Sequence, residues 1–270
     1  MSFIETIAAA WKQKNSLLCV GLDPDLRKIP SHILEKANPV FEFNRALIDS
    51  TADIVCAYKP QIAYYSASKS DDELRMTIDY IHENHPDVPV ILDAKRGDIG
   101  STASMYAIEV FDRYRADAVT VNPYMGGDTL EPFLEYKDKG VIIVCRTSNP
   151  GAGDIQDLES NGKKIYQIIA SKAARDWNSN GNVLLVVAAT YPQELGEIRG
   201  VTGDMCFLVP GIGAQGGNVR EAVENGKTPG GTGMIINSSR SIIYASRGTD
   251  FARAARKAAL DLRKEINRFR

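Results

Sequence analysis

The sequence predicts a single α/β domain over residues 1–270, folded as a (β/α)8 TIM barrel. Eight short apolar runs rich in Val, Ile and Leu recur along the chain, as is typical of strands covered on both faces. Longer amphipathic segments separate many of these runs, which favours parallel strands alternating with helices. A length of 270 residues is also close to that of one such barrel.

The eight predicted strands follow one another from the first quarter of the chain to its last. In chain order they are residues 17–22, 54–60, 88–95, 117–123, 141–147, 183–190, 205–210 and 233–239. Glycine and proline gather directly after several of these runs, for example at 122–127 and 210–217. Because the loops that follow barrel strands share one rim, we expect them to form the ligand-binding face.

Helices are predicted where apolar residues recur about every 3.6 positions beside a polar face. The segments with this pattern are 35–51, 69–84, 161–177 and 250–268. One further helix, at about 2–14, precedes the first strand, and we expect it to close the bottom of the barrel.

Composition excludes several classes of protein. A net charge of −2 gives no reason to expect binding to nucleic acid or to anionic membranes. No run of 18 apolar residues indicates a membrane span, and the N-terminal segment lacks the pattern of a secretory signal. The four cysteines lie far apart inside apolar runs, which is typical of buried reduced thiols. We therefore expect a cytoplasmic protein.

Charged residues stand at the ends of three predicted strands. Asp93 and Lys95 alternate along the third strand, so their side chains should point to the same side. Lys59 ends the second strand and Asp23 ends the first. Since neighbouring strands lie about 4.8 Å apart, these four side chains can form one array of alternating charge. Such an array could be catalytic, or it could be a structural network of ion pairs.

A phosphate site is predicted after the seventh and eighth strands, where these barrels often bind phosphate. The loop at 210–217 contains Gly211, Gly213 and Gly216, and small residues let backbone N–H groups approach an anion. Arg240 follows the eighth strand and offers a planar set of donors. The glycine-rich loop alone could be a simple turn, but the two segments together favour phosphate.

The segment 147–151 follows the fifth strand and carries hydroxyl and amide side chains. One of these is the hydroxyl of Ser148. These groups could bind the polar edge of a base, or they could cap a turn. Neither the histidines nor the cysteines are spaced as metal ligands, and we predict no metal ion.

These residues resemble the orotidine 5′-phosphate decarboxylase family. The most specific feature is the pattern DxKxxD, formed by Asp93, Lys95 and Asp98. Further matches occur along nearly the whole chain, in GLDPD, YKPQ, LDAKRGDIG, TSNPG, PGIGAQGG and NSSR. The sequence is similar to the longer bacterial subgroup of that family. Residues 152–182 depart most from the shorter form, so nothing is carried over to them.

The resemblance implies a cofactor-free, metal-free decarboxylation of orotidine 5′-monophosphate to UMP and CO2. In this interpretation Lys95 donates a proton to C6 of the base, Asp93 lies beside the reacting carboxylate, and Lys59 contacts the ribose and Asp93. The resemblance further implies a homodimer with two shared active sites, in which Asp98 reaches into the partner's site. The implied substrate-binding residues are Asp23 for the ribose, Ile99 and Thr102 beside Asp98, Ser148 for the pyrimidine, Gln215 between phosphate and base, and Arg240 for the phosphate.

Two other functions share much of this pattern. A Mg²⁺-dependent phosphosugar decarboxylase or aldolase barrel would have the same phosphate loops and the same DxKxxD residues. A nucleotide-binding barrel without catalytic activity would bind UMP but would not need like charges in one array. The effect of EDTA on activity separates the first from the main interpretation, and a substrate-decay assay separates the second.

Overall fold

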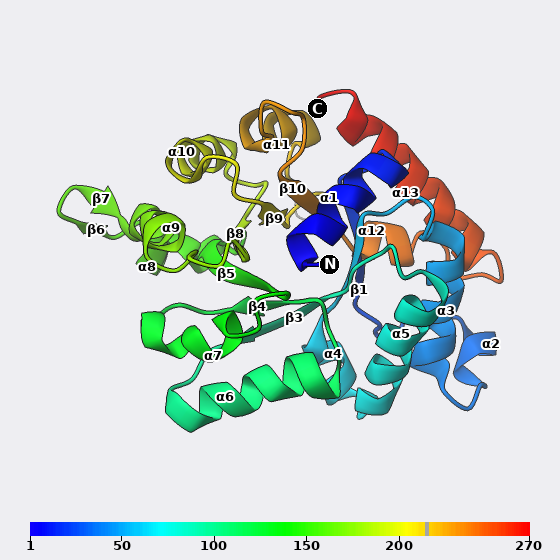
Figure 1. Cartoon of the computed structure of the whole chain (residues 1–270). Coiled ribbons are helices and arrows are strands. Elements are labelled where there is room, and N and C mark those ends of the chain that lie inside the picture. Colours follow the sequence, from blue (N-terminus) through cyan, green and yellow to red (C-terminus); the bar gives the residue numbers. More distant parts are fainter. Residues whose placement is uncertain (214–215) are drawn as a thin grey trace.

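A computed structural model shows eight parallel strands arranged in a nearly closed barrel, alternating with helices (Figure 1). The structure describes residues 1–213 and 216–270. The barrel strands are β1 (Leu18–Leu22), β2 (Ala57–Pro60), β3 (Ile91–Arg96), β4 (Ala118–Val121), β5 (Gly140–Arg146), β8 (Val183–Val187), β9 (Phe207–Val209) and β10 (Met234–Ser238). Six lie within the predicted runs, and β3 and β5 each extend one residue beyond theirs, at Arg96 and Gly140. The predicted single-domain α/β barrel is confirmed.

Closure of the barrel brings the second and third strands together. Hydrogen-bonded neighbours run in the order β2-β1-β10-β9-β8-β5-β4-β3. The two ends of this order meet through isolated parallel bridges, Tyr58 with Val90 and Gln61 with Asp93. The strand ends that carry Lys59 and Asp93 are therefore adjacent in space.

The helices surround the barrel and include the five that the sequence predicts. They are α1 (Phe3–Lys14), α2 (Ser31–Leu34), α3 (Pro39–Thr51), α4 (Ile62–Ala67), α5 (Asp71–Asn84), α6 (Gly100–Ile108), α7 (Glu131–Leu134), α8 (Gly153–Gln156), α9 (Ile165–Arg175), α10 (Pro192–Thr202), α11 (Val219–Gly226), α12 (Arg240–Ile243) and α13 (Phe251–Asn267). Two of the predicted helices begin four residues later than predicted. Helix α3 starts at Pro39, a residue favoured at a first helical position, and α9 follows a short hairpin of β6 (Glu159–Ser160) and β7 (Lys163–Lys164).

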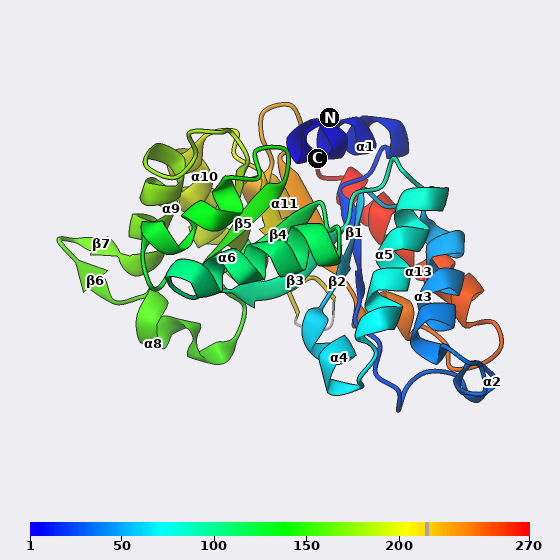
Figure 2. The same cartoon turned by 60° about the horizontal axis from the view of Figure 1, so that its bottom comes forward.

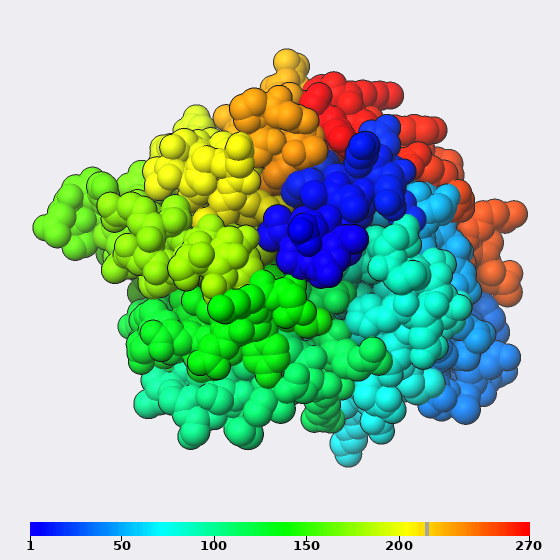
Figure 3. Space-filling view, in the orientation of Figure 1, coloured from blue at the N-terminus to red at the C-terminus, as the bar shows by residue number. Residues whose placement is uncertain are grey.

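Helix α1 lies across the N-terminal end of the barrel (Figures 1 and 3). The Ser2 side chain caps its first turn, and Glu5 completes a capping box. Phe3 packs against Gly140 at the start of β5 so closely that a Cβ there would lie 2.5 Å from the phenyl ring. Glycine at position 140 therefore lets α1 sit against this end of the barrel.

At the opposite end of the barrel, the loops that follow the strands form the rim. Side chains of β1, β2, β4, β8, β9 and β10 are buried, and this burial holds the strand ends in place. Helices α4 and α8 lie at this opposite end, away from α1 (Figure 2). Among the described residues, no helix is both long and apolar enough to cross a membrane.

Candidate active site

A cavity of about 660 Å³ opens at the C-terminal ends of the strands. Seven of the residues proposed from the sequence line it: Asp23, Lys59, Asp93, Lys95, Ser148, Gly211 and Arg240. They come from loops and strand ends far apart in the chain, and barrel closure gathers them. Gly213 and Gly216 belong to the same loop as Gly211. Among the described residues, Asp98, Ile99 and Thr102 do not line the cavity, and Gln215 lies outside the described residues.

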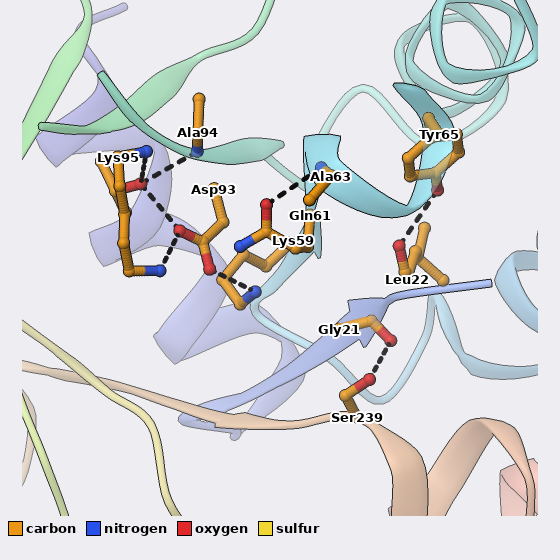
Figure 4. Close-up of polar contacts among 11 residues, drawn as sticks. Gly21, Leu22, Lys59, Gln61, Ala63, Tyr65, Asp93, Ala94, Lys95 and Ser239 are labelled. Carbon is orange, nitrogen blue, oxygen red and sulfur yellow. Dashed lines mark hydrogen bonds and ion pairs between the residues drawn. The ribbon is translucent and has the colours of Figure 1, made fainter. Parts of the chain in front are cut away.

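The centre of this site is a carboxylate held between two ammonium groups (Figure 4). Lys59 Nζ lies 3.0 Å from Asp93 Oδ2, and Lys95 Nζ lies 2.7 Å from Asp93 Oδ1. Asp93 and Lys59 are buried, whereas the Lys95 side chain is 46% exposed toward the cavity. The ammonium group of Lys95 is thus fixed by Asp93 while remaining accessible to a ligand.

The two buried members of the array are held in their charged forms. Burial favours a raised pKa for Asp93, but the ammonium groups of Lys59 and Lys95 outweigh it and lower the pKa of this carboxyl below its ordinary value. Burial would lower the pKa of Lys59, but Asp93 and Asp23 raise it above the ordinary lysine value. Both charges therefore persist throughout the neutral range of pH.

Replacing Asp93 with asparagine should destabilise the fold by about 3 kcal/mol at pH 7, because two ammonium groups lose their buried counter-charge. Since the pKa of Asp93 is lowered by folding, its contribution is complete above the ordinary value of 3.8 and is lost as the pH falls below it. Denaturant unfolding of both proteins should show a constant difference in the free energy of unfolding from neutral pH down to that value, and a smaller one below it. A difference that grows on acidification would contradict this assignment.

Lys95 reaches the cavity for a reason that differs from the predicted one. The prediction assumed a regular strand, but the register between β3 and β4 shifts between Leu92 and Arg96, and Lys95 has φ 45°. A non-glycine residue in this left-handed region costs about 1–3 kcal/mol. The predicted side is correct, yet it results from an irregular turn of the strand and not from simple alternation.

Thr120 supports this irregular backbone and was not predicted. Its Oγ1 accepts hydrogen bonds from the backbone N–H groups of Ala94 (3.0 Å) and Lys95 (2.9 Å). The same hydroxyl donates to Asp93 Oδ1 at 2.8 Å. The available signal in the sequence was a polar residue between two valines of β4, and the structure shows that this residue is fully buried.

Asp23 brings an unused acceptor to the cavity. Its Oδ1 is buried, and within the described part of the chain it has no hydrogen-bond partner. Asn237 Oδ1, on β10, is in the same state and lines the same cavity. Buried acceptors without partners are costly, so a ligand with hydroxyl donors would stabilise this part of the site.

The cavity also has an end suited to an anion. Gly211, Gly213 and Gly216 have φ values of 104°, 85° and 81°, which residues with a side chain rarely adopt. Gly217 N donates to Gly211 O at 3.0 Å, so these two glycines are held close together. Arg240 is exposed at the start of α12, and among the described residues no carboxylate pairs with it. Gln215, which the sequence placed here, lies outside the described residues.

Three predicted residues lie away from their own chain's cavity. Asp98, Ile99 and Thr102 are absent from its lining among the described residues, and Ile99 is 61% exposed. Asp98 Oδ1 accepts a hydrogen bond from the N–H of Ile99 at 2.8 Å. A site within one chain therefore does not include them. Within the described ranges, no group of three His, Cys, Asp or Glu side chains could hold a metal ion.

The comparisons with known proteins identify the family. The model of the orotidine 5′-phosphate decarboxylase / HUMPS family matches residues 16–258. This chain belongs to that family. Two curated relatives are named orotidine 5′-phosphate decarboxylase: one from Azoarcus sp. is 56% identical over 270 residues, covering 100% of both chains, and one from Cellvibrio japonicus is 58% identical, covering 99% of this chain and 98% of its own.

Solved structures of the family agree with this assignment. The chain matches the structure of Leishmania donovani OMP decarboxylase with a TM-score of 0.86 at 38% identity, covering 100% of this chain and 98% of the other. It also matches Leishmania donovani UMP synthase with a TM-score of 0.88 at 40% identity, covering 100% of this chain and 56% of that longer one. The family resemblance predicted from the sequence is confirmed.

Proposed function

We propose that this chain is a carboxy-lyase that converts orotidine 5′-monophosphate to UMP and CO2 in pyrimidine biosynthesis, without a metal or an organic cofactor. The observation that carries the proposal is the Asp93 carboxylate held between Lys59 and Lys95, in a cavity whose far end suits a phosphate. The description of the matched family names HUMPS beside the decarboxylase, so the family match alone does not choose between the decarboxylase and the phosphosugar alternative. The names of the curated relatives, at 56% and 58% identity, favour the decarboxylase over the phosphosugar alternative.

The proposed chemistry is electrostatic. When the bond between C6 and the carboxylate breaks, its electron pair stays on C6 and CO2 leaves. An ammonium group fixed beside C6 stabilises that charge as it develops, and Lys95 then transfers a proton to C6 to form the C–H bond. Asp93 orients Lys95 and repels the substrate carboxylate, although charge stabilisation by Lys95 is the larger effect.

The rest of the cavity would hold the substrate. We assign Asp23 and Lys59 to the ribose hydroxyls, an assignment supported by the unpaired Oδ1 of Asp23. Ser148 would bind the pyrimidine, and Gln215 would connect base and phosphate. The phosphate would lie between the glycine loop and Arg240, and binding there would hold the base against Lys95.

The proposal includes a homodimer in which Asp98, Ile99 and Thr102 enter the partner's site. Support comes from large apolar side chains left exposed beside Asp98: Ile99 (61%) follows it in the chain, and Met125 (45%) lies 3.8 Å from where a Cβ on Gly97 would be. Such a face is typical of a protein interface. For the location we propose the cytoplasm, which agrees with four buried cysteines that are free thiols.

An ultraviolet assay tests the activity directly. The purified protein should consume orotidine 5′-monophosphate, with the absorbance change expected for its conversion to UMP, at the same rate with and without EDTA. Activity that EDTA abolishes would favour the Mg²⁺-dependent alternative. Tight binding of UMP without any decay of the substrate would favour a nucleotide-binding barrel that is not an enzyme.

Replacing Arg240 with alanine should weaken UMP binding about 100-fold, because charged hydrogen bonds to phosphate are lost. Uridine, which lacks the phosphate, should bind the variant and the unchanged protein about equally. Isothermal titration with both ligands measures this difference. Arg253→Ala on the exposed face of α13 is the matched control and should change neither affinity. An unchanged ratio of UMP to uridine affinity in Arg240→Ala would contradict the phosphate assignment.

A further inference from the structure

Residues 150–164 follow β5 and take no part in the function proposed above. This segment contains α8, which lies at the active-site end of the barrel (Figure 2). Its last helical residue, Gln156, lines the cavity together with Thr147, Ser148 and Asn149. An amide side chain from this segment therefore borders the part of the site that we assign to the pyrimidine.

The side chain of Gln156 is bound to Thr147 at both of its polar atoms. Oε1 accepts a hydrogen bond from the backbone N–H of Thr147 at 2.9 Å, and Nε2 donates to Thr147 Oγ1 at 2.8 Å. Thr147 Oγ1 in turn donates to Asn149 Oδ1 at 2.6 Å. These three bonds fix the residues on both sides of Ser148, whose own hydroxyl makes no side-chain hydrogen bond within the described residues.

The end of α8 is anchored, so that Gln156 cannot readily move away. The next residue, Asp157, accepts a hydrogen bond at 3.1 Å from Arg146, the last residue of β5. The Arg146 side chain is only 2% exposed, and its guanidinium lies 4.0 Å from the centre of the Tyr191 ring. At Gly153 a Cβ would lie 2.8 Å from Asp157 Oδ2, so glycine leaves room for this carboxylate.

We propose that Gln156 is a positioning residue for recognition of the pyrimidine. It holds Thr147 and Asn149 so that the free hydroxyl of Ser148 faces the base before the ligand arrives, which reduces the ordering needed on binding. This inference rests on the proposed function, because it assumes that a pyrimidine nucleotide occupies the cavity. It predicts an effect on affinity that depends on the base and not on the ribose phosphate.

The test compares two ligands that differ by the base, UMP and ribose 5-phosphate. Gln156→Met keeps the length of the side chain but removes both hydrogen bonds to Thr147. It should weaken UMP binding about tenfold, the effect of roughly one net hydrogen bond, and change ribose 5-phosphate binding less than about twofold. The catalytic constant at saturating substrate should change less than KM. Isothermal titration and steady-state kinetics provide these values.

Gln167→Met is the matched control. Gln167 lies in α9, accepts a hydrogen bond from Lys164 N at 2.9 Å and donates to Glu197 at 3.0 Å, but it does not line the cavity. This variant should leave the affinities for both ligands unchanged. If Gln156→Met does not fold, Gln156→Glu gives the same comparison, because it keeps an acceptor for the N–H of Thr147 but loses the donor to its hydroxyl.

Each other outcome overturns the inference. Equal weakening of UMP and ribose 5-phosphate would mean that Gln156 only stabilises the fold, and no change in either would mean that it has no effect on binding. Failure of the unchanged protein to bind UMP would instead overturn the proposed function itself. UMP binding by the unsubstituted chain therefore distinguishes failure of this inference from failure of the proposed function.

Discussion

Replacing Lys95 with alanine is expected to lower turnover by more than about 10⁴-fold, since both the fixed positive charge beside C6 and the proton donor are lost. Binding of UMP should remain measurable, because the proposed phosphate and ribose contacts are made by other residues. The decay of orotidine 5′-monophosphate followed by ultraviolet absorbance measures turnover, and isothermal titration with UMP shows that the variant keeps a functional cavity.

The geometry explains why this effect should be so large. Lys95 Nζ is held 2.7 Å from Asp93 Oδ1, so its ammonium group is oriented before substrate binds. An exposed lysine on α13, Lys257, pairs with Asp261, does not line the cavity, and serves as the control. Lys257→Ala should retain full activity. Near-normal turnover by Lys95→Ala would show that another group supplies the proton.

Asp98→Ala should lower turnover by more than about 10²-fold, although Asp98 lies outside its own chain's cavity, because a charged group completing the site is lost. If Asp98 serves the partner's site, two inactive variants should complement each other. After random exchange of subunits between Lys95→Ala and Asp98→Ala, half of the dimers are mixed and each has one intact site. Activity should therefore recover to about a quarter of the normal value.

A second mixture controls for this recovery. We assign Lys95 and Arg240 to the same chain's site, and both line one cavity. Mixing Lys95→Ala with Arg240→Ala should consequently restore no intact site, and activity should stay at the average of the two variants. Equal recovery in both mixtures, or none with Asp98→Ala once subunit exchange is verified, would contradict a shared active site.

The strands and the gathering of charges at their ends could be predicted from the sequence alone. Runs of Val, Ile and Leu indicate burial on both faces, and no barrel strand extends more than one residue beyond such a run. Asp23, Lys59 and Asp93 end consecutive strands, so their proximity follows from parallel pairing. Helices α10 and α11 were not predicted; α10 contains two glycines, which weaken the helical pattern.

Other features of the site could not be predicted, because they depend on contacts between distant segments. The left-handed backbone of Lys95 depends on the hydroxyl of Thr120, which lies on the neighbouring strand. Likewise, the pairing of Gln156 with Thr147 depends on how Asp157 meets Arg146. Nothing in the local pattern of residues 152–164 indicates the contact of Gln156 with Thr147 or that of Asp157 with Arg146.

Which segments become strands, and which charged residues stand near their ends, follows from the pattern of residues, because apolar runs and periodicity are local properties of the chain. How those ends meet depends on the assembled barrel, since closure between β2 and β3 sets the distance between Lys59 and Asp93. The fold also leaves Asp98 outside the lining of its own chain's cavity. The direction of a side chain at a rim depends on backbone angles that the packing of neighbouring strands imposes.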